Sequence, residues 1–81
     1  MVDLALVRTV LEVLSNNGRP MTEELVGIDV EVKLRRPSIA HLIRGALRDC
    51  TQNRWAVEDS DEWGQPTFKI TAAGVEKLKA F

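Results

Sequence analysis

The sequence predicts a small α+β domain in which three helices precede a strand–turn–strand unit and a fourth helix follows it. Apolar residues recur at helical spacing in three segments before residue 51. Residues 55–57 and 67–71 are strand-like and flank a polar, glycine-containing stretch, as in a β-hairpin. The chain has 81 residues, of which 44% are hydrophobic, a length and composition typical of one ordered domain (residues 1–81).

The first helix is predicted over residues 3–16 and ends at Asn16-Asn17-Gly18. Its apolar arc is wider than the roughly 100° that a surface helix needs. The arc consists of Leu4, Val7, Leu11 and Leu14, widened by Leu6, Val10 and Val13. Either another element of the chain or a second subunit must cover the extra width of this apolar arc. We therefore consider a homodimer with Leu6, Val10 or Val13 in the interface, together with Leu78 and Phe81 of the last helix.

The segment that begins at Thr22 fits two structures. Thr22 is a suitable N-cap, and Glu23 and Glu24 in the first turn favour the helix dipole. As a helix, the segment places Leu25, Ile28, Val32 and Leu34 on one face. As a strand, it alternates Ile28, Val30, Val32 and Leu34 with charged residues. The short distance to the next helix cap favours a helix to about Lys33, and hence a helix–turn–helix pair.

The third helix is predicted over residues 38–50, because Pro37 stops the preceding segment and Ser38 can act as its N-cap. Its buried stripe is expected to contain Ile39, Ile43, Ala46, Leu47 and Cys50. Its outer face carries Ser38, His41, Arg44, Gly45 and Arg48. Gly45 in mid-helix either lets a partner approach or allows close packing. Six basic residues and one acid between Lys33 and Arg54 indicate a helix that lies against an acidic partner.

Overall composition excludes several functions. The net charge of −1 hides a segregation, since residues 33–54 sum to +5 and residues 58–62 sum to −4. One cysteine and one histidine provide neither a disulfide nor the usual zinc ligands. The sequence contains no catalytic constellation or phosphate-binding loop, so we expect no enzyme and no cofactor. It shows no membrane span and no secretory signal, which favours a cytoplasmic protein.

The C-terminal third begins after Asn53, which we expect to adopt the left-handed conformation that ends the third helix. The hairpin follows, with an acidic tip at residues 58–62 and with Phe68 and Ile70 on one face of its second strand. Thr71 then caps a last helix from Ala72 to about Ala80. Of the two tryptophans, Trp55 is expected in the core. Trp63 beside the tip either marks an interface or packs on the hairpin.

This order of elements resembles the winged-helix version of the helix-turn-helix fold. The segment I-T-A-A-G-V-E-K-L at residues 70–78 resembles the strand-to-helix junction of MarR- and PadR-like winged helices. Phe68 and Ile70 are similar to the aromatic and aliphatic positions of the second wing strand in those proteins. The resemblance implies a three-helix core, a two-stranded wing and a C-terminal helix.

The resemblance also implies a small transcriptional regulator that reads double-stranded DNA with the 38–50 helix. The implied DNA-binding residues are Arg35, Arg36, Ser38, His41, Arg44 and Arg48. Wings of this family usually carry basic residues at the tip, whereas this tip holds four acids in five residues. An alternative function is therefore a protein–protein interaction module that contacts a basic protein with the acidic wing and Trp63.

Overall fold

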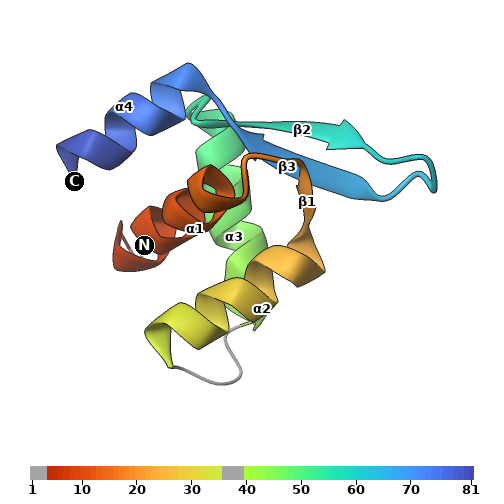
Figure 1. Ribbon diagram of the computed structural model, residues 1–81, viewed down its shortest axis with the longest axis horizontal. Coiled ribbons are helices and arrows are strands. Elements are labelled where there is room, and N and C mark those ends of the chain that lie inside the picture. Colours follow the sequence, from red (N-terminus) through yellow and green to blue (C-terminus); the bar gives the residue numbers. More distant parts are fainter. Residues whose placement is uncertain (1–3, 36–39) are drawn as a thin grey trace.

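The computed structural model describes residues 4–35 and 40–81 and confirms the α+β class. Its elements are α1 (Leu4–Asn17), β1 (Met21–Thr22), α2 (Glu23–Leu34), α3 (Ala40–Gln52), β2 (Ala56–Ser60), β3 (Pro66–Ile70) and α4 (Ala72–Ala80). Figure 1 shows α1, α2 and α3 packed together on one side of the sheet, with the β2–β3 hairpin extending away from them. Helix α4 lies at the opposite end of the molecule from the hairpin turn.

The sheet contains three antiparallel strands in the order β1-β3-β2, whereas the sequence predicted two. The additional strand, β1, places Met21 opposite Phe68 and Thr22 opposite Thr67. Met21 is buried in the core. A strand of two residues has no alternation to detect, and backbone pairing with a distant strand holds it. The sequence pattern therefore could not reveal it.

The turn of the hairpin lies further along the chain than the predicted acidic tip. Glu58 and Asp59 belong to β2, and the connection to β3 contains residues 61–65. The Asp61 carboxylate accepts hydrogen bonds from the backbone N–H groups of Trp63 (2.9 Å) and Gln65 (2.8 Å). Gly64 has φ +81°, a conformation that suits glycine. Asp61 therefore organises the turn, which is a structural role for an acid that the sequence assigned only to the surface.

The wide apolar arc of α1 is covered within the chain, except at the first residue of the helix. Leu6, Val10 and Val13 are at most 4% exposed, because α2, α3, α4 and β3 all pack against α1. The prediction that these three residues line a dimer interface was therefore wrong. Of the two residues proposed with them, Leu78 packs against the core and Phe81 is 38% exposed. A homodimer stays a prediction, but the surplus arc of α1 no longer supports it.

The ambiguous segment after Thr22 is a helix, which confirms the helical alternative. The Leu25 N–H donates to Thr22 Oγ1 at 3.3 Å, and α2 ends at Arg35 in the left-handed conformation (φ 53°). The predicted face of this helix was largely wrong, however. Its buried residues are Val26, Gly27 and Val30, with Leu34 half-buried beside them.

The reason for this error is that α2 is apolar on two opposite faces. Leu25, Ile28 and Val32 are each at least 50% exposed, although their spacing is that of a core stripe. On the other side, Gly27 faces α3, and a Cβ built there would make an ordinary van der Waals contact with Ile43 Cγ1 at 3.7 Å. Packing against α1 and α3, rather than hydrophobicity, selects the buried face.

Helix α3 buries the stripe that the sequence predicted, as far as the structure describes it. Ile43, Ala46, Leu47 and Cys50 are at most 4% exposed, whereas Ile39 lies outside the described residues. The left-handed residue after the helix is Arg54 (φ 63°), not Asn53. Asn53 instead donates from Nδ2 to the carbonyl of Asp49 at 2.8 Å, so it caps the helix end with its side chain.

The junction between β3 and α4 packs tightly on the chain that leaves α3. Thr71 caps α4 by accepting from the Gly74 N–H at 3.0 Å, and its hydroxyl donates to the Arg54 carbonyl at 2.6 Å. A Cβ built on Gly74 would overlap the carbonyl of Trp55 and come within 2.7 Å of Ile70 Cγ1. Glycine is therefore required there for close approach of two backbones. Trp55 itself is half-buried against the core.

Candidate nucleic-acid interface

The outer face of α3 is free for a partner to approach. His41, Arg44, Gly45 and Arg48 are all exposed and follow one another on successive turns. A Cβ built on Gly45 would meet nothing within 4 Å, so this glycine serves no packing inside the chain. Of the two explanations for Gly45, close packing is therefore excluded for the described residues.

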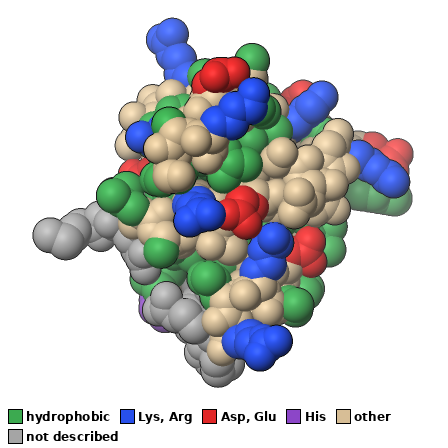
Figure 2. Space-filling view, turned by 60° about the vertical axis from the view of Figure 1, so that its left-hand side comes forward, with side chains coloured by type: hydrophobic (Ala, Val, Ile, Leu, Met, Phe, Trp, Pro, Cys, Tyr) green, Lys and Arg blue, Asp and Glu red, His purple; other side chains and the backbone are tan. Residues whose placement is uncertain are grey.

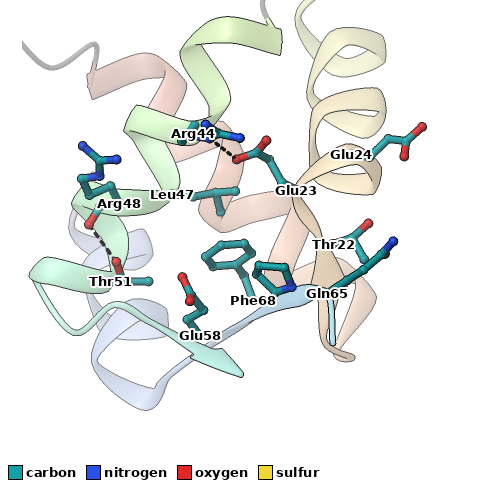
Figure 3. Close-up of a pocket in the computed structure, with 11 residues that line it drawn as sticks. Thr22, Glu23, Glu24, Arg44, Leu47, Arg48, Thr51, Glu58, Gln65 and Phe68 are labelled. Carbon is teal, nitrogen blue, oxygen red and sulfur yellow. Dashed lines mark hydrogen bonds and ion pairs between the residues drawn. The ribbon is translucent and has the colours of Figure 1, made fainter. Parts of the chain in front are cut away.

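Arg44 is held from the side by the first turn of α2. Its Nε lies 3.2 Å from Glu23 Oε1, and Figure 3 shows the two side chains pointing toward each other. The Arg44 side chain is 74% exposed and that of Glu23 is 38% exposed. An ion pair of this kind contributes about 0–1 kcal/mol. The pair therefore orients Arg44 in the free protein, and a phosphate or a base can displace Glu23 at little cost.

A hollow of about 540 Å³ separates the basic edge of α3 from the sheet. Arg44 and Arg48 line its α3 side, and Glu23, Glu24 and Glu58 line it from α2 and β2. Glu58 pairs with Phe68 across the strands, so both side chains lie on the sheet face that α3 covers. In Figure 3, Glu58 points into the hollow between Thr51 and Phe68. The residues that line the hollow thus include three glutamates and two arginines.

Charges on another side of the molecule are mixed. Figure 2, which turns the left side of Figure 1 forward, shows basic and acidic side chains interspersed with hydrophobic ones. No broad field of one sign covers the described part of that face. Charges of both signs therefore occur on this face as well as at the hollow, where two arginines lie among three glutamates.

The predicted DNA-binding residues have different positions. Arg44 and Arg48 come together at the hollow, and His41 lies further round the exposed face of α3. Arg35 is the exposed C-cap of α2. Arg36 and Ser38 lie outside the described residues.

Sequence reasoning missed the two acids that limit this surface, Glu23 and Glu58. Glu23 was interpreted only as a favourable charge in the first turn of a helix, and Glu58 only as part of a tip. Glu23 is 21 residues from its partner Arg44, so no local spacing connects them. Only the packing of α2 on α3 and the hairpin register bring these carboxylates to the arginines.

Cys50 does not contribute a reactive group. Burial, together with the nearby charge of Asp49, raises the pKa of its thiol to about 12, and the residue is 0% exposed. In the part of the chain that the structure describes, no group of three or more His, Cys, Asp or Glu residues could hold a metal ion.

Comparisons with known proteins add no relative: no family model, no curated protein and no solved structure matches this chain. Among residues 4–35 and 40–81, no helix combines the length and the apolar character needed to cross a membrane.

Proposed function

We propose that this chain is a winged-helix protein that binds double-stranded DNA through α3 and acts as a small transcriptional regulator. The observation that carries the proposal is the exposed face of α3, where Arg48 and His41 flank an unobstructed Gly45 and Arg44 lies alongside. The arrangement of α2, α3 and the β2–β3 hairpin supports it, because the hairpin follows α3 directly and packs beside it (Figure 1).

The width of the DNA major groove and the absence of a side chain at Gly45 determine how α3 would bind. A DNA major groove is about 12 Å wide and admits one helix, and Gly45 in the middle of the contact lets α3 approach closely. Arg48 can donate two hydrogen bonds to a guanine edge or hold a phosphate. Arg44 reaches the DNA after it exchanges Glu23 for a phosphate oxygen, and Arg35, the exposed C-cap of α2, can hold the DNA backbone.

The acids determine which side of α3 faces the backbone. Glu58 and Glu24 line the hollow and repel phosphates. The DNA strand therefore lies on the side of the two arginines that faces away from the hollow. The hairpin then contributes no phosphate contact in this mode, because its turn carries Asp61 and Glu62. We therefore expect α3 to contact bases in the groove while the hairpin stays away from the DNA backbone.

The test is a fluorescence anisotropy titration of the full chain at low salt against random-sequence duplex DNA and against any duplex that the chain selects from it. Arg48→Ala should weaken binding about 5- to 150-fold for a preferred site, or reduce the salt slope by about 1 if Arg48 holds only a phosphate. Lys69→Ala is the matched control, since Lys69 pairs with Val57 on the opposite sheet face from Glu58 and is exposed. Absence of binding to any duplex, or equal loss in both variants, contradicts the proposal.

One observation favours a second candidate function, a protein-interaction module. Trp63 is 80% exposed at the hairpin turn, next to Glu62. An exposed indole beside acids suits a basic protein surface. Trp63→Ala separates the two functions, because it leaves DNA binding by α3 unchanged and removes binding of a basic partner at the hairpin.

A further inference from the structure

The outer face of α2 exposes an apolar stripe that the DNA-binding proposal does not use. Leu25 is 52% exposed, Ile28 50% and Val32 71%. Their spacing of three and four residues puts them in one row along the helix, about 10 Å long at 1.5 Å per residue. Val26 and Val30, on the opposite face of the same helix, are 0% exposed. Helix α2 therefore has two apolar faces, and the described residues cover only one of them.

Acids border this stripe. Helical geometry places Glu24 and Glu31 along one side of it and Asp29 along the other. Asp29 accepts a hydrogen bond from Asn17 Nδ2 at 3.4 Å, whereas Glu24 and Glu31 form no ion pair with any described residue. A row of aliphatic side chains between carboxylates is the complement of a basic amphipathic helix.

A hollow beside the stripe strengthens this match. It has a volume of about 290 Å³ and lies between α2 and α3. Three apolar residues (Gly27, Ile28 and Ile43) and three glutamates (Glu23, Glu24 and Glu31) line it. Of these glutamates, Glu23 is paired with Arg44. The remaining two carboxylates suit the charged end of an arginine or lysine whose aliphatic stem lies on Ile28.

We infer that the Leu25–Ile28–Val32 face of α2, with its adjoining hollow, is a docking surface for an amphipathic helix of another protein that carries arginine or lysine beside its apolar stripe. A second copy of this chain fits poorly, since two α2 helices packed face to face would bring Glu24, Asp29 and Glu31 against the same acids. An anionic membrane surface is disfavoured by the same carboxylates. The inference is independent of the DNA-binding proposal, because it depends on α2 and not on the outer face of α3.

The experiment titrates the full chain into a labelled synthetic helical peptide with leucines at positions i, i+3, i+4 and i+7 and arginines beside them. A second peptide replaces every arginine with glutamate. We expect saturable binding of the basic peptide only. Ile28→Ser and Val32→Ser should each weaken it by about tenfold, since each removes roughly one aliphatic contact. Glu31→Lys should weaken it as well and make the remaining binding less dependent on salt.

Val57→Ser is the matched control, because Val57 is 51% exposed on β2 and should leave peptide binding unchanged. The substituted residues are exposed, and circular dichroism checks that each variant keeps its helices. Equal binding of both peptides, or no loss in Ile28→Ser and Val32→Ser, overturns the inference. Concentration-dependent dimerisation that Val32→Ser abolishes overturns it in favour of a second copy, and binding to anionic lipid vesicles overturns it in favour of a membrane. Duplex DNA binding should be the same in Ile28→Ser as in the parent chain, so the two proposals fail separately.

Discussion

Arg44 on α3 and Glu23 in the first turn of α2 form an ion pair, with Arg44 Nε 3.2 Å from Glu23 Oε1. The pair joins the two helices of the predicted helix–turn–helix unit and places a carboxylate next to an arginine proposed to bind DNA. It therefore competes with a phosphate for the same guanidinium group.

Removing this competition should strengthen DNA binding. Glu23→Gln keeps the size of the side chain but removes the charge, so Arg44 is released and the repulsion of phosphate falls. We expect an affinity about two- to fivefold higher at low salt, in keeping with the small energy of an exposed pair. Glu76→Gln on α4 is the control, because Glu76 pairs with Lys79 within its own helix. Anisotropy titrations of both variants give the answer, and weaker binding in Glu23→Gln would mean that the pair positions Arg44 for DNA.

The two acids of the hairpin turn should respond differently to charge reversal. The Asp61 carboxylate holds two backbone N–H groups of the turn, whereas Glu62 is exposed and forms no hydrogen bond that the described structure shows. Glu62→Lys should thus keep stability within about 0.5 kcal/mol. It should tighten DNA binding if the wing approaches the backbone and leave it unchanged in the mode proposed above. Asp61→Lys loses two charge-assisted hydrogen bonds and should destabilise the chain by about 1–3 kcal/mol. Urea unfolding and anisotropy together separate the two effects.

Gly74 and Gly45 are both helical glycines, yet replacing them with alanine should have opposite effects on stability. A Cβ on Gly74 overlaps the Trp55 carbonyl and Ile70, so Gly74→Ala should reduce the free energy of unfolding by about 3 kcal/mol or more. A Cβ on Gly45 meets nothing, so Gly45→Ala should raise it by up to about 1 kcal/mol. Thermal unfolding followed by circular dichroism measures both. A Gly74→Ala variant as stable as the parent would refute the close packing of α4 on the chain after α3.

The raised pKa of the buried Cys50 thiol leads us to expect a loss of stability at high pH. Burial raises the pKa of its thiol from 9.0 to about 12. Between these values the unfolded chain has lost the thiol proton and the folded chain retains it, so the folded state binds more protons. The free energy of unfolding therefore falls as pH rises through this window, by about 1.4 kcal/mol per pH unit from this group. Below pH 9 the thiol adds no pH dependence.

Cys50→Ala should lack this component of the pH dependence, which urea titrations between pH 8 and pH 11 would reveal by comparison with the parent chain. Thiol labelling at pH 8 is a second measurement. Because Cys50 is 0% exposed, labelling should occur only as fast as the protein opens. Rapid labelling of the native protein would contradict the buried position.

The sequence by itself determined the features that depend on neighbours in the chain. The caps Thr22 and Thr71, the helical spacing of Ile43, Ala46, Leu47 and Cys50, and the alternation around Phe68 all predicted elements that the structure contains. These signals are local, since a hydroxyl caps a backbone group three residues away and a periodic stripe is read within one helix.

The tertiary structure alone decided the rest. It selected Val26 and Val30 over Ile28 and Val32 as the buried side of α2, because that side packs against α1 and α3. It also covered most of the apolar arc of α1 within the chain, added β1 to the sheet and brought Glu23 to Arg44. Each of these outcomes depends on contacts between segments that are far apart in the chain. Two helix faces of similar hydrophobicity can each pack on the core, and a charged side chain can pair with several others. Only the simultaneous packing of all four helices and the sheet distinguishes between them.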